Sequence, residues 1–145
     1  MLYLEYEKCR CRYMNALQMY ENILDEKAEL FEKTQPKSTR YDKERVSGGQ
    51  TGNAFENYMV EVERTKINER LKAVKSMVDD RGHLLKIKEQ ELRSSKDLYD
   101  RIYTLKYLDF RKTERIAKII GYSESQTYRI IKGINKRCEK MRVEV

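Results

Sequence analysis

The sequence predicts an all-α fold in which a long antiparallel helical hairpin or coiled coil is followed by a C-terminal helix-turn-helix. Charged residues make up 38% of the 145 positions, there is one proline, and the mean hydropathy is −0.88. Such a polar chain suits long exposed helices better than a thick core. Apolar residues also recur at steps of three and four, as on one face of a helix. Near the C-terminus, a glycine followed by a Ser-x-x-Gln pattern predicts a turn between two helices.

The first long helix is expected over residues 3–33, within an N-terminal segment of residues 1–35. Its apolar residues recur at steps of seven, four and three, which places them along one face. This predicted stripe consists of Tyr6, Tyr13, Leu17, Tyr20, Leu24, Ala28 and Phe31. Pro36 ends the helix, because proline and the residue before it both resist helical backbone.

Residues 36–53 are expected to form a flexible connecting loop. The segment contains the only proline and three of the six glycines. Long stretches without periodicity are usually functional or disordered loops. The SGGQTG run at 47–52 lacks the Lys-Ser/Thr pair and the preceding strand of a phosphate-binding loop. A nucleotide site is therefore not expected there.

A second long helix is expected over residues 54–93, with a bend near Gly82–His83 because glycine weakens a helix. Its apolar residues alternate at steps of four and three, as in a coiled coil, with Val60 extending the pattern upstream. The seam consists of Ile67, Leu71, Val74, Val78, Leu85 and Leu92, with Arg81 and Lys88 at its two interrupted positions. This helix is longer than the first. The hairpin therefore leaves seam available to a second copy of the chain, and a homodimer is expected.

Residues 94–145 are expected to form the helix-turn-helix domain. Ser94 or Ser95 caps a helix over residues 94–109, and Thr113 begins a short helix. The inward-facing residues of the short helix are Ile116, Ala117 and Ile120. Those of the last helix are Thr127, Ile130, Ile134, Cys138 and Met141.

The turn between these helices carries the most specific local pattern. Gly121 is expected in the left-handed conformation that glycine adopts most easily. Tyr122 is expected to fill the corner. Ser123 and Gln126 are expected to form a capping box at the start of the last helix. A helix presented in this way can place its first turns in the major groove of DNA.

The side chains off the inward face predict a contact with double-stranded DNA. By donor and acceptor geometry, Gln126 suits adenine and Arg129 suits guanine, while Tyr128 suits a thymine methyl or a phosphate. The other basic and hydroxyl side chains suit backbone phosphates. The predicted DNA-binding residues are Thr113, Arg115, Ser123, Ser125, Gln126, Tyr128, Arg129, Lys132 and Lys136.

The charge distribution favours the same end of the chain. Residues 96–145 contain 13 Lys and Arg against 7 Asp and Glu, a net charge of +6 out of +7 for the whole chain. A basic segment on a nearly neutral body indicates a polyanionic partner. No run of 18 apolar residues and no apolar signal segment is evident, so a cytoplasmic protein without membrane contact is expected.

The cysteines and the histidine give no pattern of a catalytic or metal site. Cys9, Cys11 and Cys138 fit neither a disulfide framework nor a zinc spacing, so ordinary reduced thiols are expected. His83 has no second histidine or catalytic partner nearby in the sequence. An enzyme, a metal and a cofactor are therefore not expected.

The segment LYDRIYTLKYLDFRKTERIAKIIGYSESQTYRII at residues 98–131 resembles the helix-turn-helix of sigma-factor region four. With ERVSGG at 44–49 and the long helix that follows, residues 36–135 resemble the ArpU/RinA-type phage transcriptional regulators. This resemblance implies an activator of phage or prophage late genes that acts at promoters with the host RNA polymerase.

Two other functions fit parts of the sequence. A small terminase subunit for phage DNA packaging also joins a helix-turn-helix to helical oligomerisation segments, although its DNA-binding module tends to come first. A structural coiled-coil protein would use the helical body alone, but it leaves the basic C-terminal segment without a role.

Overall fold

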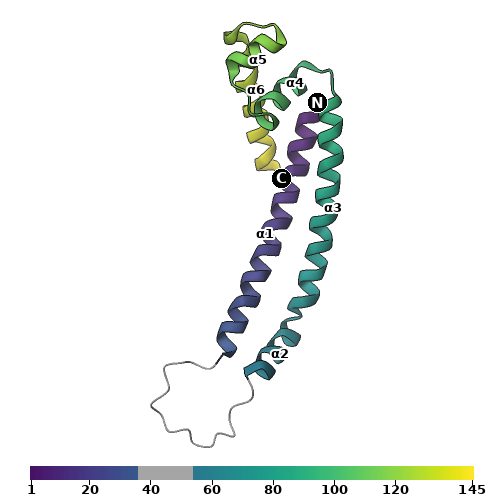
Figure 1. The fold of residues 1–145 in the computed structure, drawn as a ribbon, viewed down its shortest axis with the longest axis vertical. Helices are drawn as coiled ribbons and strands as arrows, with labels where there is room; N and C mark the ends of the chain where they lie inside the picture. Colours follow the sequence, from purple (N-terminus) through teal and green to yellow (C-terminus); the bar gives the residue numbers. More distant parts are fainter. Residues whose placement is uncertain (36–53) are drawn as a thin grey trace, which may run out of the picture. The chain divides into compact units, whose positions relative to one another are not determined.

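The computed structural model describes residues 1–35 and 54–145, and all of its elements there are helical (Figure 1). In chain order they are α1 (Leu2–Thr34), α2 (Ala54–Thr65), α3 (Ile67–Ser94), α4 (Leu98–Tyr103), the π-helix η2 (Thr104–Leu108), α5 (Thr113–Ile120) and α6 (Glu124–Glu144). The all-α prediction is confirmed for this part of the chain. The loop expected over 36–53, with its SGGQTG and ERVSGG segments, lies outside the described residues.

The second long helix is interrupted at a position that the sequence did not indicate. Lys66 has a left-handed φ of 52°, which ends α2, and its carbonyl accepts the Arg70 N–H at 3.0 Å as α3 begins. By contrast, α3 continues through Gly82 without interruption. A Cβ added to Gly82 would lie 3.1 Å from Cε2 of Tyr13. The glycine therefore accommodates an aromatic ring of α1 and does not break the helix.

The chain divides into two compact units. The first comprises Met1–Ala16 and Asp79–Val145, and the second comprises Leu17–Val78. Each unit contains part of α1 and part of α3. The division therefore runs across the two long helices and does not follow their ends.

The second unit is closed by an aliphatic core. Its buried residues are Ile23, Val62, Ile67 and Val74, with Tyr20, Leu30, Tyr58, Leu71 and Val78 packed against them. Arg70 donates two hydrogen bonds to Glu26, at 2.9 and 2.8 Å, and Lys27 donates to Asn68 at 2.8 Å. These contacts join α1 to α3 within the second unit.

Part of the stripe predicted for α1 was wrong. Leu24, Ala28 and Phe31 are exposed, whereas Ile23 is buried and Leu30 is half-buried. Two successive steps of four residues move around a helix by about 80°, so the predicted stripe drifts off the seam. The buried side instead keeps a seven-residue repeat through positions 9, 16, 23 and 30.

The upstream extension of the α3 seam to Val60 was also wrong. Val60 is 61% exposed, and Val62 is the buried valine of α2. The interruption at Lys66 breaks the register, so the repeat of α3 cannot be continued into α2. Within α3 the predicted seam residues are all buried or half-buried.

The first unit joins the start of α1 and the end of α3 to the C-terminal helices. Lys88 pairs with Glu5 at 3.2 Å, and Arg81 donates to the Arg12 carbonyl at 2.9 Å. The two interrupted seam positions thus carry polar contacts to α1. The buried core consists of Tyr3, Tyr6, Leu92, Ile102, Tyr103, Ile116, Ile131, Ile134 and Cys138.

Two carboxylates are buried within this unit and hold its parts together. Asp100 is 2% exposed and accepts the Tyr3 N–H at 3.0 Å and the Ser95 hydroxyl at 2.7 Å. Glu7 is 2% exposed and accepts a hydrogen bond from the Tyr103 hydroxyl. A buried charge is tolerated only when it is paired or hydrogen-bonded, so these contacts specify which surfaces meet.

The start of α4 differs from the expected one. The cap is Asp97, whose carboxylate accepts the Asp100 N–H at 3.3 Å, and neither Ser94 nor Ser95 takes this place. Ser95 instead accepts the Asp97 N–H at 3.2 Å while donating to Asp100. The predicted single helix over 94–109 is therefore a short loop, then α4, then η2.

Candidate nucleic-acid interface

The turn between α5 and α6 has the predicted backbone. Gly121 has a left-handed φ of 84° and ends α5. The N–H groups of Gly121 and Tyr122 both donate to the Ala117 carbonyl, at 2.8 and 3.1 Å. This arrangement satisfies a carbonyl that the end of a helix would otherwise leave free. The left-handed assignment of Gly121 is confirmed.

The capping box at the start of α6 is confirmed as well. The Gln126 N–H donates to the Ser123 hydroxyl, and the Ser123 N–H donates to Oε1 of Gln126, each at 3.2 Å. Because Oε1 is engaged in the cap, pairing with adenine requires it to accept a further hydrogen bond or to leave the cap. The cap therefore competes with the base-reading role predicted for Gln126.

The inner face of the two helices differs from the prediction at two residues. Ile131, which was not predicted to face inward, is buried with 6% exposure, while the predicted Ile130 is half-buried and packs against the same core. Tyr122 is 43% exposed, so it does not fill the corner. Thr127 is fully buried, and its hydroxyl donates to the Ser123 carbonyl at 2.9 Å. Threonine fits this buried position because the Ser123 carbonyl, one helical turn earlier, accepts a hydrogen bond from its hydroxyl.

The outer face of α6 carries four of the nine predicted DNA-binding side chains. Ser125, Arg129, Lys132 and Lys136 are exposed and recur at steps of four, three and four. These steps place them on the side of the helix opposite Thr127, Ile134 and Cys138. We call these four residues the outer stripe.

The remaining predicted residues surround the outer stripe or precede it in the chain. Tyr128 is 63% exposed, and Ser123 and Gln126 are exposed at the cap. In α5, Arg115 is exposed and Thr113 is half-buried. All nine predicted residues thus lie in the α5–turn–α6 segment with at least part of their surface accessible.

The basic residues of this face lack ion-pair partners in the described part of the chain. Neither Arg115 nor the three basic residues of the outer stripe forms a pair within 4.0 Å there, whereas Arg64, Arg70 and Arg93 elsewhere do. Exposed cations without a partner are free to meet an external anion. Glu124, in the first turn of α6, is the exposed carboxylate nearest to the cap.

Not every basic residue of the C-terminal segment faces outward. Arg142 pairs with the buried Glu7 at 3.4 Å, and Arg137 lies 5.6 Å from the centre of the Tyr99 ring. A hydrogen bond to the Tyr3 hydroxyl raises the pKa of Arg137. The net charge of the segment therefore includes cations that serve its folding, which composition alone could not separate from those that are accessible.

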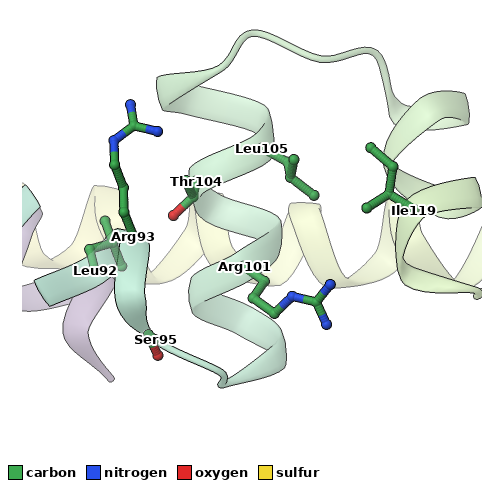
Figure 2. Close-up of a pocket in the computed structure, with 7 residues that line it drawn as sticks. All are labelled: Leu92, Arg93, Ser95, Arg101, Thr104, Leu105 and Ile119. Atoms are coloured by element: carbon green, nitrogen blue, oxygen red, sulfur yellow. The ribbon is translucent and has the colours of Figure 1, made fainter. Parts of the chain in front are cut away.

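A cavity lined in part by Ile119 of α5 is small and of mixed chemistry. It has a volume of about 170 Å³ and is lined by Leu92, Arg93, Ser95, Arg101, Thr104, Leu105 and Ile119 (Figure 2). In Figure 2, Leu105 and Ile119 face each other across it. Arg93 already pairs with Glu89 and Asp109, at 3.1 and 3.0 Å. The Ser95 hydroxyl is likewise engaged, donating to the buried Asp100 at 2.7 Å.

The described residues show no sign of two further kinds of site. Among residues 1–35 and 54–145, no group of three His, Cys, Asp or Glu side chains could hold a metal ion. None of the helices described is long and apolar enough to span a bilayer. His83 is exposed on α3, away from the α5–turn–α6 segment in sequence.

Comparisons with protein-family models, with curated proteins and with solved structures find no match for this chain.

Proposed function

We propose that this protein is a sequence-specific DNA-binding transcription regulator that uses α6 as its recognition helix. The outer stripe carries the proposal, because it presents unpaired cations on a helix that begins at a capped turn after a left-handed glycine. The first turns of such a helix are those that reach base edges in the major groove. The resemblance to ArpU/RinA-type regulators supports a phage late-gene activator that acts with the host RNA polymerase.

The proposal assigns different roles along the outer stripe. Arg129, in the second turn of α6, reads a guanine through two hydrogen bonds. Lys132 and Lys136, one and two turns further on, contact phosphates together with Arg115 and Thr113. The long antiparallel helices form the body, through which two chains assemble as a homodimer. Its two recognition helices predict half-sites about one helical turn apart, or a multiple of that distance.

Two substitutions test this division of roles. Arg129→Ala is expected to weaken binding to the preferred site by about 1–3 kcal/mol and to relax preference at one base pair. Lys132→Ala is expected to weaken binding to all duplexes alike and to reduce the slope of log K against log salt by about one. Lys75→Ala is the matched control, since Lys75 is an exposed helical lysine of the second unit.

The experiment measures the affinity of the full chain and these variants for genomic fragments selected by the wild-type protein. Enrichment of one spaced motif upstream of late genes supports the proposal. If Arg129→Ala and Lys132→Ala behave alike across sequences, the assignment of reader and phosphate contact is refuted. If neither substitution alters binding, the outer stripe is not the DNA surface. Rings of eight or more subunits in solution would instead favour a small terminase subunit.

A further inference from the structure

Gly133 is a glycine in the interior of α6 that the described fold does not require. It lies in the middle of Glu124–Glu144 and is exposed. Apart from its two chain neighbours and the adjacent backbone of α6, no described atom lies within 4 Å of the position that a Cβ would occupy. Glycine destabilises a helix interior relative to alanine, because it loses more backbone freedom on folding. The position is thus disfavoured locally, with no packing contact among the described residues to explain it.

Two other described glycines differ from Gly133 in this respect. Gly82 leaves room for the Tyr13 ring, which a Cβ would approach at 3.1 Å. Gly121 has the positive φ of 84° that the turn needs. Packing explains Gly82 and backbone conformation explains Gly121. Neither explains Gly133, so we looked for a binding partner that would favour glycine there.

The side chains around Gly133 indicate what approaches it. Arg129 lies one turn before Gly133 and Lys136 one turn after it, and both are exposed without an ion pair in the described residues. Seven residues of helix separate these cations by roughly 10 Å along the axis. Arg137, the other residue one turn after Gly133, is directed to Tyr99 and Tyr3. Gly133 therefore leaves bare helical backbone beside the outer stripe, one turn from each of these two cations.

We propose that Gly133 is the point where the sugar-phosphate backbone of double-stranded DNA lies against α6. A polyanionic strand is drawn to this surface by Lys136, already assigned to phosphate contact, and the missing side chain at Gly133 lets it approach the helix closely. The inference rests on the proposed function and deepens it, because it gives the DNA strand a defined place beside the outer stripe. The local loss of stability at Gly133 is then retained for binding.

The test compares the stability and the DNA affinity of Gly133→Ala, Gly133→Leu and the wild-type full chain. Gly133→Ala is expected to raise the melting temperature by about 3–5 °C, because alanine favours the helix and meets no neighbour. The same substitution is expected to weaken binding to a mixed-sequence duplex by about threefold, and Gly133→Leu by more than about tenfold. Asn135→Ala is the matched control: it is exposed on α6, lies off the outer stripe and also gains helix propensity.

The opposite signs of the two effects make the outcomes distinct. Higher stability with weaker binding supports the close approach, provided that Asn135→Ala gains stability and keeps its affinity. If Gly133→Ala binds as tightly as the wild-type protein, the inference is overturned while the proposed function stands. A change in oligomeric state with unchanged DNA affinity also overturns it, since the glycine would then serve a contact between chains. If the wild-type protein binds no duplex at all, the proposed function and this inference fail together.

Discussion

The first compact unit buries polar side chains in its core, whereas the second is closed by aliphatic side chains. Among the described residues, the buried polar or charged side chains are Glu7, Asp100 and Thr127, and all three belong to the first unit. The second unit keeps its charges at the surface, as in the pair of Arg70 and Glu26. An aliphatic seam tolerates changes of partner or register more readily than a buried charge does. The difference indicates that specific packing is concentrated where the proposed DNA-binding helices are held.

Truncation of one core side chain in each unit gives the largest expected effect. Ile134→Ala and Ile67→Ala each remove a side chain that is no more than 1% exposed, and each is expected to cost about 2–5 kcal/mol of stability. Hydrogen exchange followed residue by residue is expected to show the loss of protection in the first unit for Ile134→Ala and in the second for Ile67→Ala. Only Ile134→Ala should also weaken DNA binding. If each variant instead lost protection equally in both units, the two units would unfold together and could not be treated as separate.

Removal of a single hydroxyl tests the buried polar contacts next. Tyr103→Phe takes away the donor to the buried Glu7, which keeps Arg142 at 3.4 Å and Arg10 at 3.7 Å. Urea denaturation is expected to show a loss of about 1–3 kcal/mol, the usual effect of removing a partner from a buried polar group. Tyr20→Phe, against the aliphatic core of the second unit, is the matched control and is expected to change stability by less than about 0.5 kcal/mol. If the two substitutions changed stability equally, the buried polar contacts of the first unit would not distinguish it from the second.

Raising the pH is expected to lower the stability of the first unit gradually, because buried groups in its core resist losing their protons. Burial raises the pKa of Cys138 to about 11, and the nearby Glu7 carboxylate adds to this rise. Burial, with the hydrogen bond to Glu7, also raises the pKa of Tyr103 above its usual value. A group whose pKa is higher in the folded protein than in the unfolded chain contributes its full stabilisation at pH values below its pKa in the unfolded chain. That contribution is lost as the pH rises toward the folded pKa.

Because the pKa of Cys138 is raised, the free energy of unfolding is expected to fall between about pH 9 and pH 11. For one titrating group the slope is no more than roughly 1.4 kcal/mol per pH unit. Urea denaturation at about pH 8 and about pH 10.5 measures this loss. Cys138→Ala is expected to be less stable overall but to show a shallower decline with pH. A decline as steep in Cys138→Ala as in the wild-type protein would assign the alkaline loss to other groups.

Local sequence patterns predicted the parts of the fold that depend on neighbouring residues. The left-handed Gly121, the capping box of Ser123 and Gln126, and the seam of α3 all follow from interactions within a few positions of the chain. For the same reason, the accessible surface of α6 could be predicted from helical spacing. Ile131 was missed because Ile130 and Ile131 are adjacent and of the same type, so spacing alone did not choose between them.

Tertiary structure alone decided which distant groups meet. Asp100 accepts the N–H of Tyr3, and Glu7 lies buried between Tyr103 and Arg142, although each pair is separated by more than ninety positions. Periodicity treats Glu7 and Arg142 as ordinary surface charges, because it carries no information about what covers a helix face. Local patterns predicted α1, α5, α6, the turn and the basic outer stripe, but neither the interruption at Lys66 nor the loop before α4. Packing determined which cations remain accessible and which are used inside the first unit, because burial depends on residues brought together from far apart in the chain.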